Sequence, residues 1–215
     1  MQFSKDQKYA YKRIIEILYN SGIDLDSKQC SPLNNSKKSE LVIIGKAGSG
    51  KTLLLAKIVS DLTEAGLELV SGDYQINRTS EKRSLAILAP TNKAASVIRQ
   101  QGVAATTVHR ILYTPIYDPE YEKISEWLNG RQEKPIIDGL TADSLERVKS
   151  FFELNKSVPG ALASAGLRGS DFITGWKRRE DPLDIGFVDE SSMLDEQQLA
   201  DLREIFSTLI EFHCI

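Results

Sequence analysis

The sequence predicts an α/β fold in which helices flank a mostly parallel β-sheet. Three short apolar runs have the length of buried strands and alternate with helical patterns along the 215 residues; the runs are 41–44, 85–89 and 184–190. This alternation is typical of parallel sheets that are covered on both faces. Hydrophobic residues make up 41% of the chain and charged residues 27%, as in globular proteins with a substantial core.

A helix is expected over residues 1–20, where apolar residues recur at helical spacing and Ser4 can cap the start. Residues 21–39 are polar, contain Ser, Asn and Pro, and are expected to form a loop. After the strand at 41–44 and a glycine-rich turn, a second helix is expected over residues 51–65.

The elements continue in the same alternation. Residues 74–83 indicate a polar connection, and the strand at 85–89 is followed by a helix over 91–102. A short helix is expected over 106–112. Near the end, residues 195–209 have a helical pattern that begins at an N-cap aspartate.

Charge and cysteine content narrow the class of protein. The net charge of −3 excludes a wholly basic nucleic-acid-binding module, so any DNA contact has to be local. Cys30 and Cys214 have no metal-ligand spacing and are expected to be reduced thiols. No apolar run approaches the length of about 20 residues that spans a bilayer, and the N-terminus has no signal-peptide core. We therefore expect no membrane partner and a cytoplasmic location.

A glycine-rich segment between the first strand and the second helix carries the clearest chemistry. It fits G-x-x-x-x-G-K-[ST] at every fixed position, and it consists of Gly45, Lys46, Ala47, Gly48, Ser49, Gly50, Lys51 and Thr52. Glycines allow successive backbone N–H groups to point into one concavity, and the following helix N-terminus favours phosphate. The lysine supplies a positive charge for the β- and γ-phosphates, and the threonine hydroxyl is a ligand for Mg²⁺. The segment predicts a P-loop that binds ATP with Mg²⁺.

An acidic pair follows the last buried strand. Asp189 stands at the end of the apolar run "IGFV" and is predicted to hold Mg²⁺ directly or through water. Glu190 comes next and is predicted to activate the attacking water, which makes it the catalytic partner of Lys51. Together, these residues complete the carboxylate side of a P-loop ATPase.

Four motifs, "GKAGSGKT", "APTNKAA", "TTVHRIL" and "VDESSML", occur in an order that resembles RecD-like superfamily 1 DNA helicases of the 5′-to-3′ type. The resemblance implies a P-loop NTPase with a RecA-like sheet, in which Gln7 reads adenine. It also implies contacts with single-stranded DNA by Pro90, Thr91, Asn92, Lys93, Thr107 and His109. Without the resemblance, the residues of "PTNKAA" favour a helix N-cap followed by helix formers, and His109 favours a core or capping residue.

The resemblance also implies a domain organisation. Residues 1–112 and 184–215 correspond to the RecA-like ATP-binding domain, and residues 113–183 to a small inserted subdomain that contacts or splits the DNA duplex. Its aromatic residues could stack on bases or form its own core, and Trp127 favours the core. The run from Trp176 to Arg179 is the most basic patch, and it fits either phosphate contact or a solvated face.

The chain departs from the family near its C-terminus. Relatives continue with a phosphate-sensing motif and a second motor domain that supplies an arginine, whereas here residues 206–215 begin to resemble one further strand. The sequence therefore predicts a helicase domain truncated before its second motor domain. It would hydrolyse ATP slowly and unwind nothing by itself. We also expect an unpaired sheet edge near residues 208–212, and self-association or poor solubility unless the C-terminal residues fold over that edge.

Two other functions remain open at this stage. One is a stand-alone P-loop ATPase that works with a partner protein, which would donate an arginine. The other is a non-enzymatic DNA-binding protein that keeps a vestigial nucleotide fold, and whose DNA affinity would not respond to ATP.

Overall fold

The computed structural model describes residues 3–31, 38–70, 82–136 and 141–215. These residues form two compact units, of which the second is Tyr113–Arg178 and the first comprises the rest. The insertion expected over 113–183 overlaps the second unit, but its last five residues, 179–183, belong to the first. Most of the polar connection expected over 74–83 lies outside the described residues.

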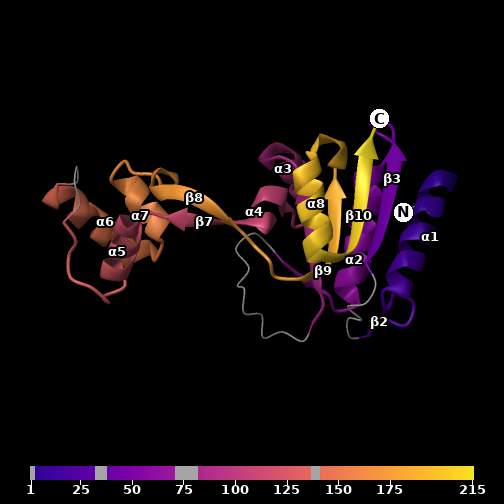
Figure 1. The fold of residues 1–215 in the computed structure, drawn as a ribbon, viewed down its shortest axis with the longest axis horizontal. Helices are drawn as coiled ribbons and strands as arrows, with labels where there is room; N and C mark the ends of the chain where they lie inside the picture. The colour runs from indigo at the N-terminus through magenta and orange to yellow at the C-terminus, as the bar shows by residue number, and fades with distance from the viewer. Residues whose placement is uncertain (1–2, 32–37, 71–81, 137–140) are drawn as a thin grey trace. The chain divides into compact units, whose positions relative to one another are not determined.

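The first unit is built on a six-stranded sheet whose pairings are all parallel (Figure 1). Its main path runs in the order β3 (Ser39–Gly45), β10 (Phe206–Cys214), β9 (Leu183–Asp189), β5 (Ser84–Ala89) and β4 (Glu68–Leu69). A sixth strand, β6 (Thr106–Thr107), also pairs with β5. The α/β fold with a parallel sheet is confirmed.

The helices of this unit follow the strands in alternation. They are α1 (Lys5–Asn20), α2 (Lys51–Glu64), α3 (Asn92–Gln100), α4 (Val108–Leu112) and α8 (Glu196–Ile205). The main core joins α1, α2 and α3 to the sheet through fully buried residues such as Ile14, Leu55, Ile87 and Phe212. In Figure 1, α8 lies in front of β9 and β10. Strands β9 and β10 pack closely, because a Cβ atom at Gly186 of β9 would come within 3.0 Å of the ring of Phe206 in β10.

Three expectations need correction. The loop expected over 21–39 contains a short antiparallel pair, β1 (Ile23–Asp24) and β2 (Gln29–Cys30). The helix expected over 195–209 ends at Ile205, and Phe206 already begins β10. The unpaired edge expected near 208–212 was wrong, because β10 lies between β3 and β9 and pairs with both. Self-association through an open β10 edge therefore has no structural basis.

The described residues of the second unit, 113–136 and 141–178, form an antiparallel pair of strands and three α-helices. Strands β7 (Tyr113–Tyr117) and β8 (Ile173–Arg178) pair with each other. Helices α5 (Pro119–Leu128), α6 (Ala142–Asn155) and α7 (Val158–Ser164) lie between them in the chain, followed by a 3₁₀ turn, η1 (Gly169–Phe172). Trp127 is 9% exposed and packs in this unit's own core with Val148 and Phe152, which favours a structural role.

No helix among the described residues is long and apolar enough to cross a membrane.

Candidate nucleotide site

The P-loop connects the end of β3 to the start of α2. Gly48 and Gly50 have φ values of 76° and 79°, in the left-handed region that favours glycine. This backbone path turns the chain sharply, so that α2 begins at Lys51 with its first N–H groups beside the loop. The glycines of the motif thus occupy positions where other residues would be strained.

In the structure, the Lys51 ammonium folds back onto its own loop. Its Nζ donates to the carbonyl of Gly45 at 2.7 Å and to that of Lys46 at 3.0 Å. These bonds hold a positive charge inside the concavity of the loop. Phosphate oxygens can take the place of the carbonyls, because an ammonium group bonds an anion more strongly than a neutral acceptor.

Thr52 and Asp189 are 137 residues apart in the sequence and meet at the site. The Thr52 hydroxyl donates to Oδ2 of Asp189 at 3.4 Å. Asp189 is only 7% exposed, and burial raises the pKa of its carboxyl group, an effect that the nearby Glu190 charge reinforces. The Glu190 backbone N–H, Lys51 and Thr52 lower the same pKa. A hydroxyl and a buried carboxylate are the oxygen ligands that Mg²⁺ prefers, so the pair fits a bound Mg²⁺.

Glu190 follows Asp189 with a left-handed backbone, at φ 54°. Its backbone N–H donates to Oδ1 of Asp189 at 3.1 Å, and its own side chain is exposed. The buried hydroxyl of Ser191 donates to the carbonyl of Phe212 at 3.3 Å, which ties this turn to β10. The turn therefore directs the first carboxylate into the protein and the second toward solvent.

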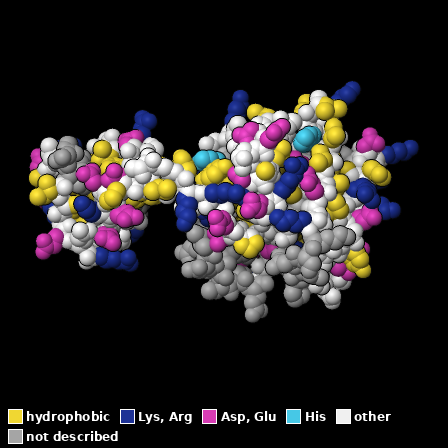
Figure 2. Space-filling view, viewed as in Figure 1, with side chains coloured by type: hydrophobic (Ala, Val, Ile, Leu, Met, Phe, Trp, Pro, Cys, Tyr) yellow, Lys and Arg dark blue, Asp and Glu magenta, His cyan; other side chains and the backbone are white. Residues whose placement is uncertain are grey.

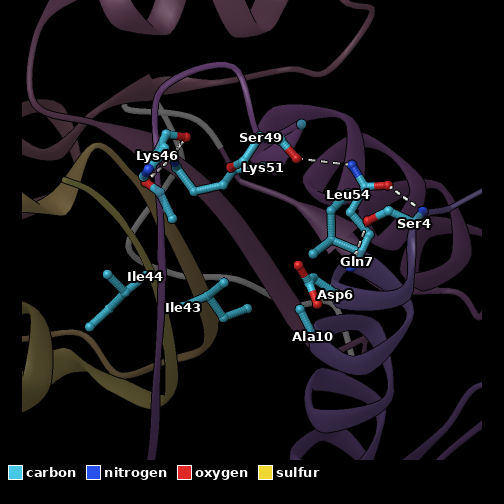
Figure 3. A pocket seen from close by; sticks show the side chains of 12 residues that line it. Ser4, Asp6, Gln7, Ala10, Ile43, Ile44, Lys46, Ser49, Lys51 and Leu54 are labelled. Atoms are coloured by element: carbon cyan, nitrogen blue, oxygen red, sulfur yellow. Dashed lines mark hydrogen bonds between the residues drawn. The ribbon is translucent and has the colours of Figure 1, made fainter.

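Two cavities flank the P-loop, and both are lined by Gly50 and Lys51. The larger, of about 610 Å³, also contains Thr52, Asp189 and Glu190, and we call it the metal-side cavity. The smaller, of about 460 Å³, lies between α1 and the end of β3, and we call it the α1-side cavity (Figure 3). One elongated ligand could occupy both cavities by crossing the P-loop.

Gln7 connects the α1-side cavity to the P-loop. It closes a capping box at the start of α1 with Ser4, and its Nε2 donates to the carbonyl of Ser49 at 3.0 Å (Figure 3). The contact is close, because a Cβ at Gly50 would come within 2.3 Å of Nε2. The residue expected to read adenine thus lies beside the phosphate-binding loop.

The family model of the AAA domain matches residues 25–209, which include the P-loop and the acidic pair. This chain belongs to the AAA domain family. Membership, together with the complete P-loop, indicates a domain that binds nucleotides, typically with Mg²⁺, and hydrolyses them. No curated protein matches the chain.

The residues expected to contact DNA lie at helix starts of this AAA domain. Thr91 caps α3 by accepting a hydrogen bond from the Ala94 N–H at 3.1 Å, and Asn92 and Lys93 are exposed in the first turn. Thr107 is buried and accepts from the Arg110 N–H at 3.4 Å, while Pro90 and His109 are half-buried. The capping interpretation of the PTNKAA segment thus holds at Thr91, and none of the six residues expected to contact DNA lines either cavity.

The sequence did not reveal every residue that lines these cavities. Cys214 and Gln101 line the metal-side cavity, and Asp6 lines the α1-side cavity. Cys214 ends β10 directly beside Gly45, the first glycine of the P-loop. Both cysteines are free, as expected. Only the order of strands in the sheet, which sequence patterns do not give, places Cys214 at the site.

Proposed function

We propose that this AAA domain binds Mg-ATP and hydrolyses it as the nucleotide-binding half of a RecD-like motor that acts on single-stranded DNA. The observation that carries the nucleotide part is the meeting of Thr52 and Asp189 beside Lys51, in a cavity open to a ligand. Neither a helix-capping turn nor a chance cluster of glycines requires a hydroxyl, a buried carboxylate and a lysine to meet in this way.

Each residue of the site has a role that follows from its position. Lys51 exchanges two backbone carbonyls for the β- and γ-phosphates. Thr52 and Asp189 hold Mg²⁺, which when bound neutralises charge on the same phosphates. Glu190, exposed on the metal-side cavity, orients the attacking water and accepts its proton.

The described lining of the two cavities contains lysines but no arginine. An arginine that reaches the transferred phosphoryl group typically contributes about 10³–10⁵ in rate. We therefore propose that a second motor domain or a partner protein supplies this cation. The domain alone is expected to bind ATP, to hydrolyse it slowly and not to separate strands.

The DNA part of the proposal rests on the resemblance and on exposed groups at the start of α3. Asn92 and Lys93 follow the N-cap Thr91 and can contact phosphate oxygens. On the face drawn in Figure 2, Lys and Arg side chains are interspersed with Asp and Glu, in accord with the net charge of −3. DNA contact through a local patch, and not through an extended basic surface, fits this distribution.

The nucleotide site is tested by titrating a fluorescent ATP analogue into the wild type and two lysine variants. Lys51→Ala should weaken binding by about a hundredfold or more, because it removes the charged hydrogen bonds to phosphate. Lys57→Ala is the matched control, since Lys57 lies on the same helix and pairs with Asp61 away from the cavities. Equal binding by the wild type and Lys51→Ala would remove the site assignment.

The DNA role is tested by the ATPase rate with and without single-stranded DNA. Stimulation that is reduced in Lys93→Ala supports the motor proposal. Binding of DNA that does not respond to ATP would favour a vestigial nucleotide fold. Restored hydrolysis on adding a protein partner, without DNA, would favour the stand-alone ATPase.

A further inference from the structure

The turn that ends α3 holds the backbone of Gln101 in one place beside the metal-side cavity. The Gln101 N–H donates to the carbonyl of Ile98 at 3.0 Å. The Arg99 guanidinium donates to the carbonyl of Ala105 at 2.8 Å, which ties the segment after the helix back to it. Ile98 and Val103, on either side of the turn, are buried in the main core. The backbone at Gln101 is therefore fixed from both sides.

The side chain of Gln101, unlike its backbone, is available to a ligand. It is exposed, lines the metal-side cavity and forms no hydrogen bond with any described residue. Gln100, the residue before it, is also exposed but lines neither cavity. A primary amide has two N–H donors and an oxygen with two lone pairs. Gln101 thus brings unused donors and acceptors to the cavity.

The terminal phosphate of a bound ATP belongs in this same cavity. Lys51, whose charge suits the β- and γ-phosphates, lines it together with Thr52 and Asp189. The Mg²⁺ that this pair fits bridges the β- and γ-phosphates in P-loop enzymes. Gln101 and Glu190 line the space around these groups, so an amide and a carboxylate both border the place of the terminal phosphate.

A water molecule that attacks this phosphate has two hydrogens to place. Its oxygen forms a bond to the γ-phosphorus, while the bond from that phosphorus to the β–γ bridging oxygen breaks and ADP leaves with the electron pair. One proton passes to Glu190. The other stays on the oxygen, and an acceptor for it would point a lone pair of the water at phosphorus. A glutamine amide suits this place, because its oxygen accepts from the water while its NH₂ group donates to a phosphate oxygen.

We infer that Gln101 contacts the terminal phosphate and the attacking water, as a second water-positioning group beside Glu190. This inference rests on the proposed nucleotide site and adds a residue to its hydrolytic step. Because Gln101 is the C-cap residue of α3, the contact also joins this helix directly to the ligand.

Removal of the amide should slow hydrolysis and leave the binding of ADP unchanged. We expect Gln101→Ala to lower the single-turnover rate of ATP hydrolysis by about tenfold to a hundredfold, because the water is less well oriented. Gln100→Ala is the matched control and should keep the wild-type rate, since Gln100 lies one residue earlier and outside both cavities. Equal rates in the two variants, or a loss of ADP affinity as large as the loss of rate, would overturn the inference.

An added charge tests the location of the Gln101 side chain without relying on the rate. Gln101→Glu keeps the shape of the side chain but places a carboxylate beside the terminal phosphate. We expect its affinity for ATP to fall by about fivefold or more relative to its affinity for ADP, because like charges repel at close range. Gln100→Glu adds the same charge one residue away and should keep the wild-type ratio. An unchanged ratio in Gln101→Glu would also overturn the inference.

The wild type separates a failure of this inference from a failure of the proposed function. If the wild type binds no nucleotide, or binds ATP without hydrolysing it, the proposed function itself fails. If it binds and hydrolyses ATP while the Gln101 variants behave like the Gln100 variants, only the role of Gln101 fails.

Discussion

Asp189 and Glu211 are buried carboxylates on neighbouring strands of one sheet, and they have opposite surroundings. They are 7% and 1% exposed, and burial is the main reason that the pKa of each is raised. Asp189 faces the Thr52 hydroxyl and a cavity large enough for a ligand. Glu211 does not line either cavity; it faces other side chains.

Charged and titratable side chains surround Glu211. Arg203 donates three hydrogen bonds to Glu40, at 2.6 to 3.1 Å, and lies 3.8 Å from Glu211. His213 lies 3.5 Å from the same carboxylate. Arg203 lowers the pKa of Glu40, whereas Glu40 raises that of Glu211. Burial and a shifted pKa are therefore common to both carboxylates, and only the open space beside Asp189 indicates a binding role.

The largest effect on ATP hydrolysis is expected from a substitution of Glu190, the exposed neighbour of Asp189. Glu190→Gln should lower the rate of ATP hydrolysis by about 10²–10⁴ and leave ATP affinity nearly unchanged, because the amide cannot accept a proton from water. Single-turnover hydrolysis and nucleotide titration measure the two quantities separately. A rate equal to that of the wild type would assign the proton acceptor elsewhere.

The second effect concerns Asp189 itself. Asp189→Asn should weaken the Mg²⁺-dependent part of ATP binding by roughly tenfold to a hundredfold, since an amide is a poorer partner for the metal. Without ligand, the same variant should melt at the wild-type temperature or above it, because a buried charge has been removed. Titrations with Mg²⁺ and with EDTA, together with melting curves, test both parts. A large loss of ligand-free stability would make Asp189 structural, like Glu211.

The pH dependence of Mg-ATP binding also distinguishes Asp189 from Glu211. Because the pKa of Asp189 is raised above its ordinary value of 3.8, protons compete with Mg²⁺ at a higher pH than for an exposed aspartate. Mg-ATP affinity should therefore fall as the pH decreases through that raised pKa. The fall should be absent in Asp189→Asn and unchanged in Glu211→Gln. A fall that persists in Asp189→Asn would place the titrating group elsewhere.

The smallest effect is expected at Glu211. A folded-state pKa raised above the ordinary value of 4.5 means that folding stability falls as the pH rises through this range. Glu211→Gln has no carboxyl group to ionise, so it does not lose this stability. As the pH is raised from 4.5 toward 8, its melting temperature should therefore rise relative to that of the wild type. The expected difference is about 2–4 °C for each kcal/mol of stability that the wild type loses. ATP affinity should not change. A variant that melts well below the wild type at pH 8 would show that the ionised network is stabilising.

The sequence predicted some strands of the sheet better than others. Strands β5 and β9 are buried along nearly their whole length, so their apolar runs are unambiguous. Strand β10 was partly mistaken for a helix, because Phe206 and Leu209 continue the apolar spacing of α8. Local periodicity cannot decide such a case, since sheet pairing on both sides overrides it.

The chemistry of the P-loop and the acidic pair was readable because it depends on residue types at fixed local spacing. The cavity lining was not readable, because Asp6 and Cys214 reach the site through the placement of α1 and the order of strands. The contact of the Gln7 side chain with the P-loop likewise depends on the backbone carbonyl of Ser49, which no sequence pattern marks. The second unit is built on its own small core, whose helices have no motif to anchor an interpretation.

The position of β10 has a consequence for how the protein matures. Strand β3, which precedes the P-loop, and strand β9, which precedes the acidic pair, do not touch in the sheet; β10 separates them and pairs with both. While β10 is still inside the ribosome, the nascent chain already contains the P-loop and the acidic pair, but it lacks the strand that joins β3 to β9. Nucleotide can therefore stabilise the domain only after β10 has been synthesised, so the segments made before β10 fold without help from the ligand.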